Sequence, residues 1–86
     1  MQRDPEEVEF NRIVGEIMRK LRVKHKMSRP QAAERLGYRG VGSLYRVEVG
    51  RYSLPLYRAA IASQVYGVSI DKLLASVRRR MSQISV

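Results

Sequence analysis

The sequence predicts a small all-α domain of five helices, and three observations predict it. Apolar residues recur every three or four positions through most of the chain, the spacing that places side chains on one face of an α-helix. Between these stretches stand residues that cap helix starts or close helix ends: Asp4, Ser28, Ser69, Gly37, Gly50 and Gly67. The length of 86 residues suits one hydrophobic core. We therefore expect a single domain over residues 1–86, with its core in about 8–77.

The first helix is expected to run from Asp4 to about His25. Asp4 can cap it, Pro5 fits the first helical position, and Glu6 and Glu7 complement the positive end of the helix dipole. The stripe that should face the core consists of Phe10, Ile13, Val14, Ile17, Met18 and Leu21.

Two further features of this helix bear on its surface. Gly15 is its weak spot, because glycine lowers helix stability. Basic residues gather near its end: Arg19, Lys20, Arg22, Lys24 and Lys26. They complement the negative helix end, and they either face a phosphate backbone or form an ordinary solvated face.

The segment from Met27 to Gly50 is expected to form two short helices joined by a turn. Ser28 and Gln31 form an S-x-x-Q capping box for the first, which should end near Leu36. The second is expected over about 41–49, with Val41, Leu44 and Val47 toward the core and Gly42, Ser43, Tyr45 and Arg46 elsewhere on its circumference. Such a pair is either a DNA-binding helix-turn-helix or an ordinary helical hairpin.

The remainder of the chain predicts two more helices. Pro55 suits the opening of the fourth, whose face is marked by Leu56, Ala59, Ala62, Val65 and Tyr66. Ser69 can cap the fifth, whose apolar face is Ile70, Leu73, Leu74 and Val77. The tail, residues 78–86, begins with Arg78, Arg79 and Arg80 and contains Met81, Ile84 and Val86. With no core of its own to join, it either packs on a second subunit or frays.

The charge of the chain points to an acidic polymer as partner. Seventeen Lys and Arg stand against eight Asp and Glu, giving a net charge of +9 and a pI near 10.7. The first ten residues carry −3, so the rest of the chain carries +12. Such a balance favours nucleic acid over a membrane.

Several classes of protein are excluded by composition. The absence of cysteine excludes a disulfide framework and a thiolate zinc site. The lone His25 has no neighbours at ligand spacing, and neither a catalytic constellation nor a Gly-rich phosphate loop occurs, so we expect no enzyme, no metal and no cofactor. No run of about 18 apolar residues is present, and the acidic N-terminus lacks the form of a signal peptide. We expect a cytoplasmic protein with no membrane partner.

The segment from Met27 onward resembles the Xre/Cro family of helix-turn-helix repressors, whose pattern is approximately L-S-Q-x-x-L-A-x-x-x-G, a turn, I-S-x-I-E-x-G, a Pro and V-S-x-x-x-L. The matching residues are Met27, Ser28, Arg29, Ala32, Ala33, Gly37, Leu44, Tyr45, Val47, Glu48, Gly50, Pro55, Val68, Ser69 and Leu73. The resemblance covers about 10–74. It implies a lambda repressor-like domain that binds double-stranded DNA sequence-specifically as a homodimer on a two-fold operator, with repression of transcription as the outcome.

Three departures from the family pattern affect the expected site. One extra residue between Gly37 and Leu44 lengthens the turn, as in a sub-pattern of the family. Arg29 stands where the family usually has a glutamine that bonds a backbone phosphate, and Tyr45 replaces the usual serine. The resemblance also implies that Glu48 supports the end of the recognition helix, so its role is expected to be structural.

The expected DNA-binding residues divide by their position. Those closest to base edges are Arg39, Gly40, Val41, Gly42 and Ser43, near the start of the recognition helix. An arginine can fork to guanine, a serine can bond either base type, and an unburied valine can contact a thymine methyl group. Tyr45 and Arg46 can reach bases or phosphates. Arg29, Arg51 and Tyr52 are expected phosphate contacts, the last two because the family's loop approaches the backbone.

Two other kinds of partner remain open. As a DNA-binding regulator, the chain resembles phage Cro-like regulators, self-repressing antitoxins and restriction controllers equally. The first other partner is a protein, if the chain is an interaction module such as an antitoxin that neutralises a partner. The second is RNA, which usually requires a platform of stacking aromatics. Salt dependence separates DNA from protein, because neutralising several phosphates makes affinity fall steeply with salt, whereas a hydrophobic protein interface depends on salt weakly.

Overall fold

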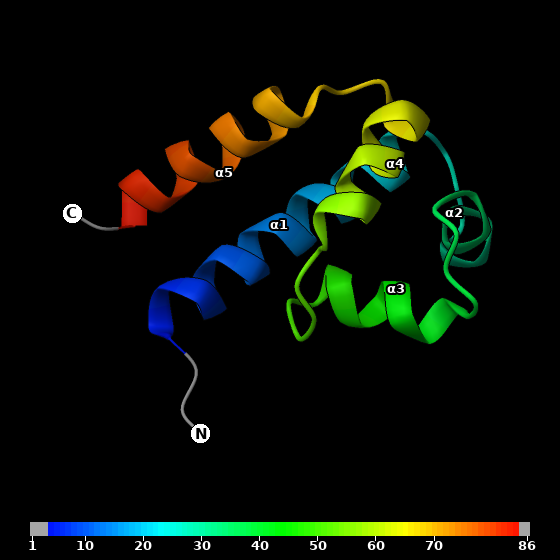
Figure 1. The fold of residues 1–86 in the computed structure, drawn as a ribbon, viewed down its shortest axis with the longest axis horizontal. Helices are drawn as coiled ribbons and strands as arrows, with labels where there is room; N and C mark the ends of the chain where they lie inside the picture. Colours follow the sequence, from blue (N-terminus) through cyan, green and yellow to red (C-terminus); the bar gives the residue numbers. More distant parts are fainter. Residues whose placement is uncertain (1–3, 85–86) are drawn as a thin grey trace.

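A computed structural model describes residues 4–84 and contains five helices. They are α1 (Pro5–Lys24), α2 (Arg29–Arg35), α3 (Val41–Glu48), α4 (Leu56–Tyr66) and α5 (Ile70–Ile84) (Figure 1). No strand occurs in this part of the chain. The all-α prediction is confirmed, and the first three helices begin and end within one residue of their expected bounds.

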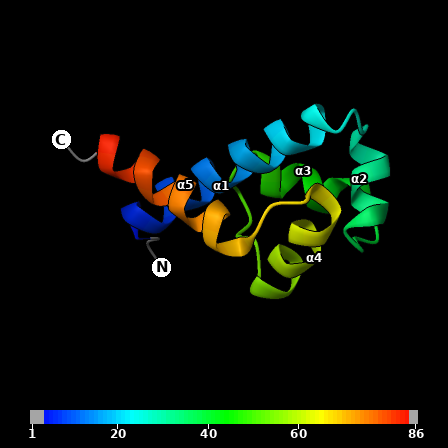
Figure 2. The same cartoon turned by 90° about the horizontal axis from the view of Figure 1, so that it is seen from above.

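The long helix α1 is the element on which the others are arranged. It packs against α3 on one side and α5 on another, while α2 packs on α3 and α4 on α5. Figures 1 and 2 both show α5 running alongside α1. The short α2–α3 pair lies at one end of the molecule, away from the end of α1 where the chain begins.

The predicted caps are present at three helix starts. The Asp4 carboxylate accepts from the backbone N–H two residues on at 3.0 Å. The Ser28 hydroxyl accepts from the Gln31 N–H at 3.2 Å, and the Gln31 side chain accepts from the Ser28 N–H at 2.9 Å, which completes the capping box. Ser69 caps α5 through a bond of 3.0 Å to its hydroxyl. These bonds satisfy N–H groups that a helix start otherwise leaves unpaired.

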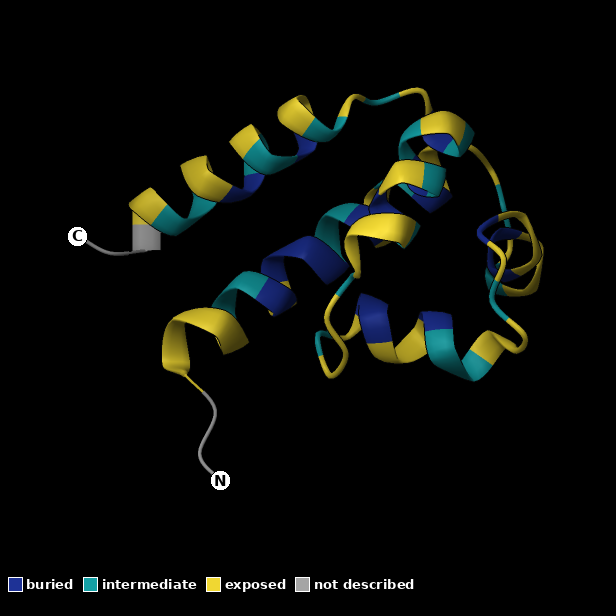
Figure 3. Cartoon of the chain, in the orientation of Figure 1, coloured by how far each residue is buried: buried dark blue, intermediate teal, exposed yellow. Residues whose placement is uncertain are grey.

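The core draws side chains from all five helices. Its buried members are Ile13, Val14, Met18, Ala32, Ala33, Leu36, Leu44, Ala62, Tyr66 and Val77. Figure 3 shows the buried side of each helix facing the others. Within residues 4–84, no helix combines the length and the apolar character needed to cross a membrane.

Three apolar residues lie elsewhere than predicted. Leu56 is 74% exposed and Val41 is 44% exposed, although both were expected to face the core. Each is the first residue of its helix, and one turn later Ala59 and Leu44 are buried, so the apolar face begins only where a neighbouring helix covers it. Met81 packs against the core, because α5 continues through the expected tail as far as Ile84. Val86 lies outside the described residues.

An ion pair fixes this extension of α5 to α1. Arg80 Nη2 lies 2.9 Å from Glu16 Oε2, and the hydrogen bond lowers the pKa of the Glu16 carboxyl. Arg80 therefore pairs with a carboxylate of α1, whereas Arg78 and Arg79 are exposed. The three successive arginines face different directions, as helix geometry requires.

Replacing Tyr66 by phenylalanine is expected to stabilise the protein. The ring is only 3% exposed, and its hydroxyl has no hydrogen-bond partner among the described residues. A buried unpaired hydroxyl costs about 1–3 kcal/mol, so Tyr66→Phe should raise the free energy of unfolding by about 1 kcal/mol in urea denaturation at neutral pH.

The gain from Tyr66→Phe should grow in alkali. Burial raises the pKa of Tyr66 from its ordinary value of 10.0 to about 12. The folded state therefore favours the neutral phenol, and its stability is complete below pH 10.0 and falls as the pH rises toward 12. The same substitution at exposed Tyr57 is the control, and it should change the free energy of unfolding neither at neutral pH nor in alkali. A wild-type protein that lost no more stability in alkali than Tyr66→Phe would contradict this account.

Candidate nucleic-acid interface

Helix α3 buries one flank and leaves the other in solvent. Leu44 and Val47 are buried beneath α1 and α2, whereas Tyr45 and Arg46 are exposed. Figure 3 shows the exposed side of α3 turned away from α1. We call this outward side, with the segments that flank it, the α3 surface; it consists of Arg39, Gly40, Val41, Gly42, Ser43, Tyr45, Arg46, Arg51 and Tyr52.

The start of α3 is open to a partner. Gly40 is its N-cap in an extended conformation and supplies no side-chain cap, and a Cβ at this position would meet nothing within 4 Å. Arg39 and Val41 on either side are exposed, while Gly42 and Ser43 are half-buried. The exposure of Val41, which departs from the predicted stripe, leaves its methyl groups accessible.

Two arginine side chains of this region lie over tyrosine rings. The Arg29 guanidinium is 5.3 Å from the centre of the Tyr45 ring, and that of Arg46 is 5.6 Å from the centre of the Tyr52 ring. Such cation–π contacts restrict both partners and leave the guanidinium edges available for hydrogen bonds. They connect α2, α3 and the following loop into one polar surface.

A buried ion pair anchors the end of α3. Glu48 accepts hydrogen bonds from Arg22 at 2.8 Å (Nε to Oε2) and 3.2 Å (Nη2 to Oε1), and its side chain is 1% exposed. Arg22 also donates to the Met27 carbonyl at 3.1 Å. The hydrogen bond to Glu48 raises the pKa of Arg22, so the guanidinium keeps its charge in the interior. The expectation that Arg22 faces solvent or phosphate is wrong.

Arg29 completes this cluster from α2. Its Nε lies 3.1 Å from Glu48 Oε1, and its side chain is 35% exposed. It therefore contacts the end of α3 from within the protein, while part of its side chain remains at the surface. The expected structural role of Glu48 agrees with these contacts, which tie α3 to both α1 and α2.

Gly15 on α1 lies directly against the backbone at the end of α3. A Cβ on Gly15 would lie 2.3 Å from the Val47 carbonyl oxygen and 2.5 Å from that of Glu48. The expected weak spot of α1 is thus the place where the end of α3 approaches most closely.

The electrostatics of the α3 surface suit a polyanion. Among residues 39–52 the only carboxylate is Glu48, which is buried and paired with arginines. Arg39, Arg46 and Arg51 are exposed on this surface. No group of three or more His, Asp or Glu residues that could hold a metal occurs in the described chain.

Sequence reasoning missed Arg22 although a signal was available. Arg22 follows Val14 by eight residues and Met18 by four, so helical spacing places it on the inward face of α1. Because four other basic residues surround it, the sequence pattern of the whole run indicates an exposed basic face. His25 is exposed, its Nδ1 lies 2.9 Å from the Leu21 carbonyl oxygen, and it takes no part in the α3 surface.

Comparison with protein-family models gives no match for this chain, and comparison with curated protein sequences gives none either. The candidate interface accordingly depends on its own geometry and charge.

Proposed function

We propose that the protein is a sequence-specific DNA-binding regulator of transcription, in which α2 and α3 form a lambda repressor-like helix-turn-helix and α3 enters the major groove. One observation carries this proposal: the α3 surface bears Arg39, Arg46 and Arg51 without an exposed carboxylate, while the apolar flank of α3 is buried. A helix fixed along one flank and cationic along the other matches a groove lined by phosphates.

In this proposal some residues of the α3 surface contact bases and others contact phosphates. Arg39, Val41 and Ser43 face base edges, because residues at the start of the recognition helix lie deepest in the groove. Arg51 and Tyr52 bond the phosphate backbone beside it. Arg29, held by Glu48 at 3.1 Å, adds a phosphate contact from α2.

We further propose that the chain acts in the cytoplasm as a homodimeric repressor of the Xre/Cro type on a two-fold operator. Selecting bound sequences from random duplex DNA tests partner and symmetry together. An inverted repeat with a constant half-site spacing supports the proposal. Recovery of no common motif, with equal affinity for all duplexes, contradicts it.

Arg39→Ala is expected to lower affinity for the selected duplex by about 1–3 kcal/mol while changing affinity for random DNA far less. Fluorescence anisotropy at several salt concentrations measures both. Arg79→Ala is the matched control, because Arg79 is equally a single exposed arginine but lies on α5, which packs on α1 and α4. If Arg39→Ala lowered the affinity for the selected duplex and for random DNA equally, Arg39 would not contact bases.

A protein partner is the second candidate function, as in an antitoxin that neutralises a toxin. It is favoured by the exposed Leu56 and Tyr57 at the start of α4, which are large apolar side chains with no role in the α3 surface. Binding of a partner protein through them would depend weakly on salt, whereas DNA binding should weaken steeply.

A further inference from the structure

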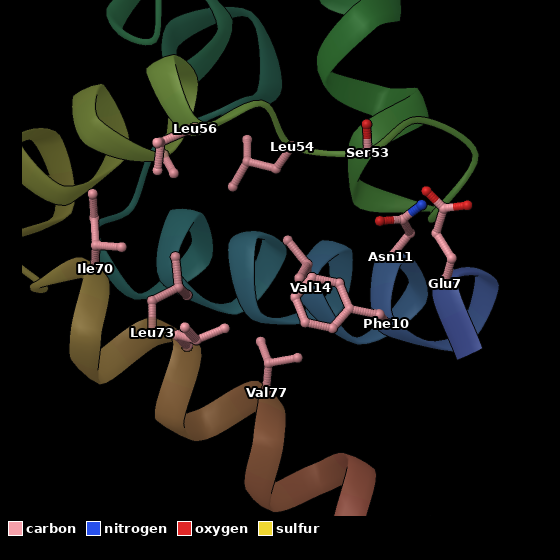
Figure 4. A pocket seen from close by; sticks show the side chains of 12 residues that line it. Glu7, Phe10, Asn11, Val14, Ser53, Leu54, Leu56, Ile70, Leu73 and Val77 are labelled. Atoms are coloured by element: carbon pink, nitrogen blue, oxygen red, sulfur yellow. The ribbon is translucent and has the colours of Figure 1, made fainter. Parts of the chain in front are cut away.

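An apolar cavity lies outside the α3 surface, between α1, α4 and α5. Its volume is about 360 Å³, and the loop 53–54 closes one side. Figure 4 shows the apolar side chains that surround it, among them Phe10, Val14, Leu54, Leu73 and Val77. The volume lies in the range of about 300–1,000 Å³ that small-molecule sites occupy.

One polar side chain in the wall of this cavity has no partner. Asn11 on α1 is 4% exposed, and its amide makes no hydrogen bond to any described residue. The other buried polar residues, Arg22 and Glu48, satisfy each other. Among residues 4–84 the buried side-chain atoms without a partner are the Tyr38 and Tyr66 hydroxyls, so the Asn11 amide reaches solvent through the cavity and both its polar groups are open to a ligand there.

Two more polar groups converge with Asn11. Figure 4 shows Glu7 and Ser53 at the same end of the cavity, with the apolar side chains extending away from them. Glu7 belongs to an acidic first turn that also contains Glu6, so this end of the cavity favours positive charge. The site is thus polar and anionic at one end and apolar along its length.

We propose that this cavity binds a small amphiphilic cation, a molecule with an aliphatic body and a primary ammonium head. The body occupies the space between Val14, Leu54 and Leu73. The head donates to the Asn11 carbonyl oxygen and the Ser53 hydroxyl, and the Glu7 carboxylate neutralises its charge.

Occupancy of this cavity also has a consequence for the α3 surface. Ser53 and Leu54 directly follow Arg51 and Tyr52, so the wall of the cavity and the loop beside α3 are one segment. A ligand that fixes this loop alters the affinity for DNA. This consequence rests on the proposed function, whereas binding of the cation does not.

Titration with octylamine, octanol and octanoate tests the site in the absence of DNA. Calorimetry should show one octylamine bound per chain, with octanoate weaker by about tenfold or more because Glu7 repels it. Heteronuclear NMR should place the largest shifts at the Asn11 side-chain amide and at Leu54. Octanoate binding as tightly as octylamine, or shifts confined to other surfaces, would overturn the proposal.

Variants of the polar end separate a ligand site from a structural one. Asn11→Leu should leave the melting temperature of the free protein unchanged or higher and weaken octylamine binding by about tenfold. A lower melting temperature for Asn11→Leu would instead make the amide structural and overturn its assigned role. Glu7→Gln should abolish the preference for octylamine over octanol. Glu6→Gln is the matched control, since Glu6 shares the same exposed turn but does not line the cavity.

A second copy of the chain is the competing occupant. Sedimentation equilibrium of the wild type and of Leu56→Asp, at the exposed rim of the cavity, tests it. If the wild type dimerises, the variant is monomeric and octylamine binds neither, the cavity is a subunit interface and the proposal fails. Because none of these measurements contains DNA, that failure leaves the proposed function untouched.

Discussion

Replacing Glu48 by alanine is expected to lower the free energy of unfolding by about 3–5 kcal/mol, the cost of leaving one member of a buried ion pair alone. The Arg22 side chain is only 10% exposed and cannot recover water without moving α1. Arg29 loses its carboxylate as well. Since small domains unfold at about 5–15 kcal/mol in total, this single change approaches the stability of the whole protein.

Urea denaturation followed by circular dichroism measures the effect. Glu34→Ala is the matched control, because Glu34 is an exposed glutamate on α2 and should change stability by no more than about 0.5 kcal/mol. A loss below about 1 kcal/mol for Glu48→Ala would mean that the Arg22 charge is solvated or paired in another way.

A double variant distinguishes the charge from the packing. Arg22→Met combined with Glu48→Leu removes both charges and keeps apolar volume, so most of the lost stability should return. Recovery would show that the single variant fails because of an uncompensated charge. If the ion pair also fixes the direction of α3, the double variant should still alter the DNA binding that we propose, since Arg29 loses its anchor in both cases.

The helices themselves could be predicted from local chemistry. Asp4, Ser28 and Ser69 cap as expected, and helical periodicity identifies the buried flank of α3. These features depend on residues within four positions of each other along the chain. The same local reasoning fails at Leu56 and Val41, because whether a helix's first turn is covered depends on a neighbouring element.

The interior of the candidate site could not be predicted in this way. The partner of Arg22 is 26 residues distant and that of Arg29 is 19 residues distant, so no local pattern specifies either contact. A run of basic residues predicts a charged surface, but only the packing of α3 on α1 determines that one of them turns inward. Asn11 belongs to the same group, since the absence of a hydrogen bond is a property of its surroundings.

Gly15→Ala is the second change with a large expected effect. Here helix propensity and tertiary packing change the free energy of unfolding in opposite directions. In an exposed helix interior, replacing glycine by alanine gains about 1 kcal/mol. At position 15 the new Cβ would lie 2.3 Å from the Val47 carbonyl oxygen, which is backbone and cannot rotate away. Overpacking of this kind costs about 1–3 kcal/mol and occasionally more, and with the helix gain subtracted we expect a net destabilisation of up to about 2 kcal/mol.

Gly42→Ala supplies the matched control for Gly15→Ala within the same packed unit. A Cβ at Gly42 would meet only the Arg46 guanidinium, at 3.2 Å, and that flexible end can move. This variant should therefore gain up to about 1 kcal/mol. Opposite signs for two glycine-to-alanine changes, measured by the same urea denaturation, would establish that close approach of α1 to the end of α3 outweighs helix propensity. If both variants gained stability, α3 would have to sit farther from α1 than these distances place it, and the direction in which it presents its arginines would change with it.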